Sequence, residues 1–410
     1  MNAGSAVRKL CFPDGFFPVE GFEVLLDDLH ARVLVLEESI RCAVLVLEMT
    51  SLPPNEIETL NDILKRETGA AHCFSLVTHT FSAPHFLPDH ILKTEEEKSK
   101  KGKLQAAVYQ AVREASREAA QKLHPVTMEV GMAQCAVNSA RDVETPMGWW
   151  IANNGSGPVD HTMTVVRFAD EAGNNTAVLV HYPIQSSVLD GSQLSAGGKA
   201  VSGDLAGLMA NALEKELDCP VLFLIGAAGD QVPRQKAVGF RLAPDGAMIP
   251  TDMHDGAIPI ARQLADEMAA AALAALEDTK PMDCAKLHWH QATVTVPAKK
   301  MERDLHKLHP TRIPPYEPDG ESEQTVDLLQ IGSLKFIGVK PELNGVTAKE
   351  ISGYDQMVKV VTLWNGGAKY MADAASYDRI TYEAQNSPFM KGAAELLAKC
   401  AGELLAEVDS

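Results

Sequence analysis

Short apolar runs recur along the chain, and several come in pairs separated by a few polar residues. This pattern is typical of β-hairpins, in which a tight turn joins two strands. The second pair encloses the turn-forming segment Asp-Glu-Ala-Gly-Asn-Asn, and the third is centred on Gly332-Ser333. Three hairpins are therefore predicted, over residues 31–37 with 42–48, residues 162–168 with 176–181, and residues 327–340.

Between these runs lie segments whose apolar residues repeat with the helical period. In residues 55–67, the side chains of Ile57, Leu60, Ile63 and Leu64 fall on one helical face. Residues 104–123 are rich in strong helix formers, and the His-Pro dipeptide that follows stops the helix. Further helices are predicted over residues 205–217, about 257–277 and about 388–407, and further strands over residues 73–77 and 358–364.

Residues 221–234, VLFLIGAAGDQVPR, place an apolar strand directly before a glycine-rich turn. The strand shows no alternation, as expected when both of its faces are covered. Gly226 and Gly229 let the backbone turn tightly and approach a ligand, and Asp230 follows at once. The segment resembles an active-site turn of an α/β enzyme, although a plain connection between a strand and a loop fits the same residues.

Strands joined both by hairpins and by helices indicate an α/β protein with mixed β-sheets and flanking helices. No linker, repeat or low-complexity tract divides the chain, so a single domain over residues 1–410 is expected. Residues 310–323 are expected to form a long irregular loop. The mixed-charge stretch KTEEEKSKKGK at residues 93–103 is interpreted as a solvated loop that leads into a helix.

The balance of charged residues disfavours some classes of binding partner. There are 37 Lys and Arg residues against 55 Asp and Glu, and the formal charge of −18 disfavours nucleic acid and anionic membranes. A small-molecule substrate is the expected partner, and a homo-oligomer is compatible with the sequence. The N-terminus lacks a secretion signal, no run approaches the roughly 20 apolar residues that span a bilayer, and the seven scattered cysteines form no C-x-x-C pair. These features indicate a cytoplasmic protein with reduced thiols.

Four side chains able to bind a metal follow predicted strands directly: His79, His181, Glu342 and Tyr370. Ligands of α/β proteins gather beyond strand ends, and two imidazoles with a carboxylate suit zinc. A phenolate is an unusual but chemically reasonable fourth ligand. The spacing alone also fits histidines with structural hydrogen bonds, because these residues lack the local constraint of an H-E-x-x-H helix.

Several ordered motifs resemble the catalytic domain of the neutral/alkaline ceramidase family, in particular its short bacterial relatives. The resemblance covers roughly residues 20–395. The motifs are THTFSAP (78–84), GPVDHTMTVVRF (157–168), VLVHYP (178–183) with SGD (202–204), GAAGDQVP (226–233), VKPELNG (339–345) and LWNGGAKYMADAASYDRITYE (363–383).

The resemblance implies a ceramidase-like fold, zinc held by His79, His181, Glu342 and Tyr370, and hydrolysis of an amide by a metal-activated water. Two departures from the family matter. Val232 stands where the large ceramidases have a serine, and Phe81 stands in place of their second histidine. Neither side chain can act as a nucleophile or donate to an oxyanion. A counterpart of the C-terminal immunoglobulin-like domain of the large enzymes is not expected within residues 1–410.

The leading hypothesis is a zinc-dependent hydrolase of an amide or related acyl C–N bond in a small soluble substrate, without a serine nucleophile. Asp230, Asp204 and Asp160 are candidates for the general base, although turn hydrogen bonds and helix capping explain them equally. Candidate substrate-binding residues are Ser82, Gly226, Gly229, Arg141 and Arg234. The alternatives are a noncatalytic zinc-bearing binding protein and a metal-dependent isomerase or lyase.

Overall fold

The computed structural model describes residues 1–242, 248–302, 304–355 and 357–409. One five-stranded sheet has the order β5-β4-β3-β1-β6. The hairpin predicted near residue 40 is confirmed, because β3 and β4 pair antiparallel with Ala31 opposite Leu47. The strands are β1 (Asn2–Lys9), β3 (His30–Glu37), β4 (Arg41–Leu47), β5 (His72–Val77) and β6 (His124–Pro125).

A second five-stranded sheet has the order β13-β11-β10-β7-β17. The antiparallel hairpin of β10 and β11 confirms the second predicted hairpin. All five residues of β13 are buried and the strand pairs parallel to β11, as its continuous apolar run predicts. The strands are β7 (Thr127–Gln134), β10 (Thr162–Ala169), β11 (Asn175–Tyr182), β13 (Val221–Ile225) and β17 (Lys280–Met282).

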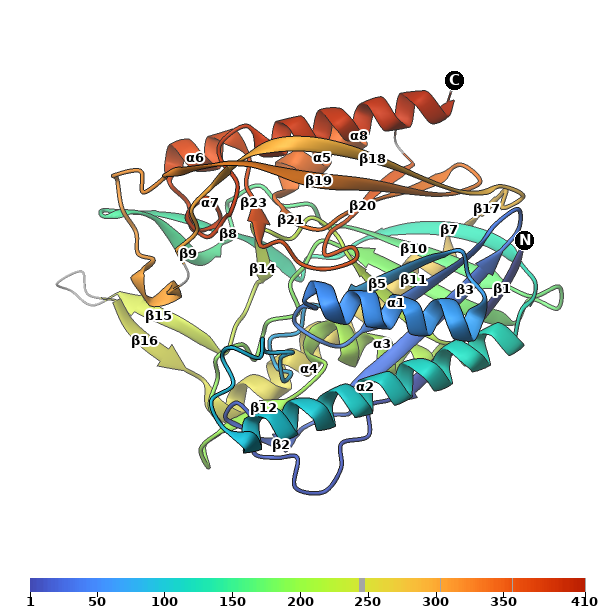
Figure 1. The fold of residues 1–410 in the computed structure, drawn as a ribbon, viewed down its shortest axis with the longest axis horizontal. Coiled ribbons are helices and arrows are strands. Elements are labelled where there is room, and N and C mark those ends of the chain that lie inside the picture. Colours follow the sequence, from blue (N-terminus) through green and yellow to red (C-terminus); the bar gives the residue numbers. More distant parts are fainter. Residues whose placement is uncertain (243–247, 303, 356, 410) are drawn as a thin grey trace.

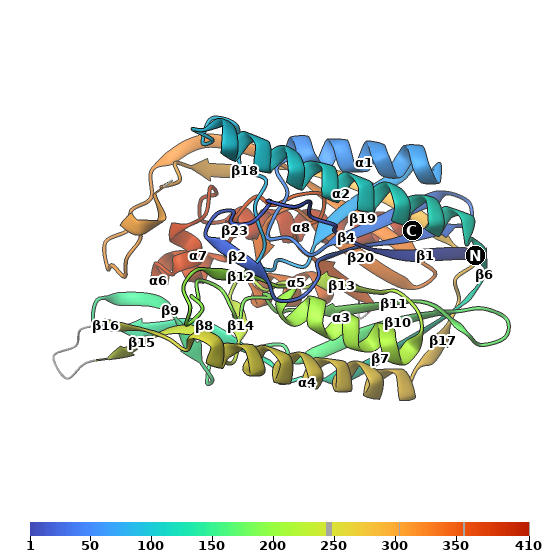
Figure 2. The same cartoon turned by 90° about the horizontal axis from the view of Figure 1, so that it is seen from below.

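The two sheets form the middle of a layered arrangement with helices outside (Figure 2). Helices α1 (Pro54–Thr68) and α2 (Glu95–Gln121) pack on the first sheet, and α3 (Asp204–Leu217) and α4 (Ala257–Glu277) pack on the second. Between the sheets, β13 contacts β3, β4 and β5. Leucines and valines of both sheets form the core there, since each strand presents alternate side chains to that face.

A third sheet of order β18-β19-β20-β22 covers one long side of this arrangement, with α5 and α8 on its outer face (Figure 1). The turn between β19 and β20 lies at Gly332, which confirms the third predicted hairpin. Trp364 joins this sheet to the first one, since its ring lies 4.7 Å from that of Phe74. The elements are β18 (Leu287–Lys299), β19 (Pro318–Ile331), β20 (Leu334–Val339), β22 (Val358–Val361), α5 (Gly345–Ser352) and α8 (Ala393–Asp409).

Smaller elements surround the ends of the central strands. They comprise a three-stranded sheet of order β14-β8-β9, three two-stranded pairs and short helices. They are β2 (Phe22–Leu25), β8 (Asn138–Thr145), β9 (Gly148–Asn154), β12 (Lys199–Val201), β14 (Gln231–Pro233), β15 (Val238–Leu242), β16 (Met248–Asp252), β21 (Glu342–Leu343), β23 (Tyr370–Met371), α6 (Ala374–Arg379), α7 (Tyr382–Gln385), η1 (His254–Gly256) and η2 (Leu305–Lys307).

Two predicted loops are shorter than expected. The stretch at residues 93–103 is almost entirely helical, because Thr94 and Glu97 form a reciprocal capping box and α2 begins at Glu95. Three glutamates in its first turn also favour the helix by interacting with the helix dipole. The loop at residues 310–323 ends where β19 begins at Pro318. Across the described ranges, none of the helices has the length and apolar character needed to cross a bilayer.

Candidate functional site

His79 lies two residues beyond β5 in a backbone conformation with φ of 58° and is 5% exposed. Its Nδ1 lies 2.5 Å from the carbonyl oxygen of Thr50, which can only accept a hydrogen bond, so Nδ1 is the donor. This contact fixes the ring. The other nitrogen, Nε2, lies 3.3 Å from Oε2 of Glu342. Burial alone would lower the pKa of His79, but the nearby Glu342 carboxylate outweighs burial and raises it.

Glu342 and Tyr370 stand side by side because β21 and β23 pair in parallel with these two residues in register. Both are buried, Glu342 at 4% exposure and Tyr370 at 6%. Burial opposes ionisation of Glu342, but His79 and Arg141 outweigh it and hold the pKa of the carboxyl below its ordinary value. Burial also raises the pKa of the Tyr370 phenol well above its usual range.

Arg141, from β8, connects these residues to a second buried carboxylate. Its Nε donates to Oε1 of Glu383 over 2.6 Å, and the two side chains are almost fully buried. The guanidinium carbon lies 5.0 Å from the ring centre of Tyr370 and 5.6 Å from that of Tyr382, within range of cation–π attraction. An arginine that joins distant segments in this way fixes their relative positions.

The sequence analysis missed Gln185, which completes this group. Its Nε2 donates to Oε2 of Glu342 over 2.8 Å, and its Oε1 accepts from Nη1 of Arg141 over 3.2 Å. Its 2% exposure matches that of its neighbours. The available sequence signal was a polar residue just beyond an apolar strand, in Pro183-Ile184-Gln185. We call the set His79, Arg141, Gln185, Glu342, Tyr370 and Glu383 the buried cluster.

His181 lies apart from the buried cluster. It occupies β11, and its Nε2 donates to the carbonyl oxygen of Val360 on β22 over 2.8 Å. Its Nδ1 is enclosed and has no hydrogen-bond partner among the described residues. Burial lowers the pKa of His181 to about 4, so the ring is neutral at pH 7. The structure therefore brings His79, Glu342 and Tyr370 together but places His181 elsewhere.

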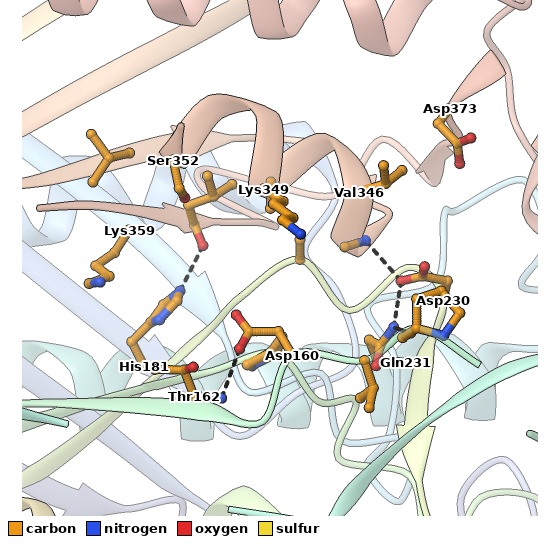
Figure 3. A pocket seen from close by; sticks show the side chains of 18 of the residues that line it. Asp160, Thr162, His181, Asp230, Gln231, Val346, Lys349, Ser352, Lys359 and Asp373 are labelled. Atoms are coloured by element: carbon orange, nitrogen blue, oxygen red, sulfur yellow. Dashed lines mark hydrogen bonds between the residues drawn. The ribbon is translucent and has the colours of Figure 1, made fainter. Parts of the chain in front are cut away.

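His181 instead lines a cavity of about 700 Å³ between the turn after β13, helix α5 and strand β22 (Figure 3). Asp160 and Asp230 also line this cavity. Asp230 accepts hydrogen bonds from the amide of Gly345 and from Gln231, and burial raises its pKa to about 6. Asp160 is exposed and accepts from the amide of Thr162 over 2.8 Å. His79 does not line this cavity, although the backbone of Asp230 accepts a hydrogen bond from the amide of Arg141.

Asp204 has a structural environment. It is fully buried, and its carboxylate accepts hydrogen bonds from the amides of Val188, Leu189 and Leu205, at 3.2, 2.9 and 2.7 Å. The residue begins α3, one position before the helix predicted over residues 205–217. Its carboxylate holds residues 188–189 against the start of this helix.

Among the candidate substrate-binding residues, only Arg141 belongs to the buried cluster. The amides of Gly226 and Gly229 donate to the carbonyls of Tyr182 and Leu343, so they do not form an oxyanion site as they stand. Arg234 pairs with Glu267 on the surface over 2.7 Å. Ser82 lines a much smaller cavity of about 20 Å³ with Phe81, whose ring centre lies 4.6 Å from that of His79.

The buried cluster does not offer the donor set that zinc requires. Zinc sites use thiolate, imidazole and carboxylate ligands, typically three or four of them. Here His79, Glu342 and Tyr370 supply one imidazole, one carboxylate and one phenol, Gln185 presents an N–H donor, and Arg141 adds a permanent positive charge. Within the described residues, no three His, Cys, Asp or Glu side chains form a group able to hold a metal. The residues present therefore do not fit the zinc site that the family resemblance implies.

Comparison with known proteins identifies the fold. No protein-family model and no curated protein sequence matches the chain. A solved structure described as ceramidase complexed with C2 matches 99% of this chain and 75% of its own, with a TM-score of 0.74 and 14% identity. Neutral ceramidase from Pseudomonas aeruginosa matches 99% of this chain and 74% of its own, with a TM-score of 0.72 and 14% identity. The chain therefore has a mixed α/β fold of the neutral ceramidase type.

One of the two sequence departures from the family contacts the buried cluster, and the other lies on the strand paired with β8. Val232 on β14 is buried and pairs with Ser139 on β8, two residues before Arg141. Phe81 packs edge-on against the ring of His79. An aromatic side chain thus contacts the cluster where the family resemblance implies a histidine, and an aliphatic side chain stands on the neighbouring strand where it implies a serine.

Proposed function

We propose that the chain is a hydrolase that cleaves an amide or a related acyl C–N bond of a small substrate at the buried cluster. The observation that carries this proposal is the pairing of His79 with Glu342 at 3.3 Å, beside Arg141 and Tyr370, in a fold shared with ceramidases. Ceramidases are named for cleaving ceramide, which is an N-acyl amide. The formal net charge of −18 favours a small soluble substrate over a lipid in an anionic membrane.

The cluster supplies the groups that such a reaction needs. Nη2 of Arg141 is buried and makes no hydrogen bond to a described residue, so it can donate to the carbonyl oxygen of the substrate and to the oxyanion that replaces it. His79, held by Thr50, can take a proton from the attacking water at Nε2. Water adds to the acyl carbon, the C–N bond breaks, and the same proton passes to the leaving nitrogen. The products are a carboxylic acid and an amine.

A zinc-dependent form of this reaction was the expectation from the sequence. It requires His181 as a ligand, whereas this side chain is bonded to Val360. None of the steps above is assigned to a metal for that reason. The proposal rests on the protein side chains of the buried cluster.

A noncatalytic binding protein is the second candidate, and one observation favours it. Phe81, against the ring of His79, and Val232, on the strand paired with β8, stand where the family resemblance implies reactive side chains, and both are inert in acyl transfer. Such a protein would retain the polar cluster as a recognition site. It would bind amides without converting them.

A hydrolysis screen separates the two candidates. Purified protein is incubated with N-acyl amino acids, cyclic amides and N-acyl sugars, and released amine or ring opening is measured. Turnover that falls at least about 100-fold in His79→Ala and Glu342→Ala supports the hydrolase, since a catalytic proton-transfer group contributes roughly that much. His288→Ala is the matched control, because His288 is exposed on β18. Turnover that survives both cluster variants, or substrate binding without turnover, contradicts the hydrolase.

A further inference from the structure

We infer that Gln185 closes the buried cluster as a hydrogen-bond donor, and that the chain for this reason retains no zinc between His79 and Glu342. This inference concerns the composition of the site and does not depend on whether the chain hydrolyses amides. Gln185 becomes a positioning residue that joins Arg141 to Glu342. Three contacts support the inference: two involve the Gln185 amide and Glu342, and the third involves His181.

The first contact fixes the orientation of the Gln185 amide. Arg141 has only donors, so the atom of Gln185 that meets Nη1 must be the carbonyl oxygen Oε1. The amide nitrogen then faces the opposite direction, where it lies 2.8 Å from Oε2 of Glu342, which accepts hydrogen bonds. Both partners require the same orientation. A flipped amide would place two donors together at one end and two acceptors at the other.

The second contact concerns the oxygen that a metal would need. Oε2 of Glu342 already receives the N–H of Gln185 and also faces Nε2 of His79. A metal on these two atoms would sit beside an N–H donor, which cannot ligate it. The guanidinium of Arg141, bonded to the same amide, adds an unfavourable positive charge in a water-poor environment. The geometry therefore favours a hydrogen-bonded cluster over a metal centre.

The third contact prevents His181 from supplying the missing imidazole. β11 pairs with β10 on one side and with β13 on the other, and His181 lies opposite Thr164 and Leu224 in these two ladders. Its ring is held by the carbonyl of Val360. Bringing it to Glu342 would break this hydrogen bond and disturb two strand pairings. Gln185 follows the end of β11, where the backbone is free to turn towards the cluster.

Zinc content tests the inference directly. The full chain is equilibrated with excess ZnCl₂, passed through gel filtration, and its metal is counted by mass spectrometry, with circular dichroism as the check on folding. If the buried cluster binds no zinc, removing His79 has no effect on zinc binding. Wild type and His79→Ala are therefore expected to contain the same amount of zinc per chain. Gln185→His supplies an imidazole at the position of the amide and is expected to bind zinc at least tenfold more tightly than wild type.

Two further variants remove ambiguity. His288→Ala/His290→Ala eliminates an exposed histidine pair on β18 that can bind zinc adventitiously. Gln185→His/Glu342→Gln must lose the gained affinity if the new site is the buried cluster. About one zinc per wild-type chain that disappears in His79→Ala overturns the inference. An unchanged zinc affinity in folded Gln185→His overturns it too, because Gln185 would then not be the determinant.

The wild-type measurement decides the main point even if Gln185→His fails to fold. Failure of the hydrolysis screen leaves the zinc result standing, since zinc content is read without a substrate. Conversely, zinc in the wild-type cluster would leave hydrolysis intact and change only how the site is composed. The two proposals can therefore fail separately.

Discussion

Nε2 of His79 lies 3.3 Å from Oε2 of Glu342, although the two residues follow strands of different sheets. His79 follows β5 of the first sheet and Glu342 follows β20 of the third. Their contact joins two layers of the fold at the point where Arg141 and Gln185 also meet. The side chains proposed to act on the substrate therefore also hold the two layers together.

Removal of either member of this pair is expected to destabilise the fold. His79→Ala and Glu342→Ala should each lower the free energy of unfolding by about 3 kcal/mol, because each leaves a buried polar partner without its counterpart. The double variant should lose less than the sum, with a coupling of about 1–3 kcal/mol. Urea unfolding of the four proteins measures this coupling. Additive losses would show that the two side chains do not interact.

Arg141→Lys is expected to be a damaging substitution. A lysine ammonium cannot hold Glu383 and Gln185 at once or pack its plane between Tyr370 and Tyr382, so we expect a loss of about 2–4 kcal/mol. The matched control is Arg234→Lys, whose partly exposed pair with Glu267 should cost under about 1 kcal/mol. Denaturant midpoints of both variants provide the comparison. Equal losses would contradict a special role for Arg141.

Asp204 is expected to contribute to the stability of the fold and not to catalytic turnover. Asp204→Ala removes three hydrogen bonds, from the amides of Val188, Leu189 and Leu205, and we expect a loss of about 2–3 kcal/mol in unfolding free energy. Turnover per folded molecule should change less than threefold on any substrate the screen finds. A large drop in turnover at unchanged stability would restore Asp204 as a candidate base.

Asp27 should make stability depend on pH. It accepts from Ser202 and Gly203, yet burial raises its pKa from 3.8 to about 6. A carboxyl with a higher pKa in the folded state contributes stability fully below its unfolded pKa and loses that contribution as the pH rises through its folded pKa. The stability of wild type relative to Asp27→Asn should therefore fall by roughly 2 kcal/mol between about pH 4 and about pH 7. Urea unfolding across this range checks the sign, and a relative stability that rises with pH would refute it.

The amino-acid sequence by itself determined most of the elements. The hairpins, the amphipathic helix α1 and the covered strand β13 follow from local periodicity, which depends only on residues close together in the chain. Strand ends also marked His79, Glu342 and Tyr370, because strands of an α/β fold direct their following residues to a common region. The single domain remains a prediction.

Only the tertiary structure decided which side chains meet. His181 and Gln185 are four residues apart and both belong to the region around the end of β11, so the local pattern did not distinguish them. The strand ladders hold His181 towards Val360, whereas Gln185 lies beyond the ladders and reaches Glu342. Contacts such as Arg141 with Glu383 join segments far apart in the chain. No local periodicity encodes them, because they depend on how the sheets pack against one another.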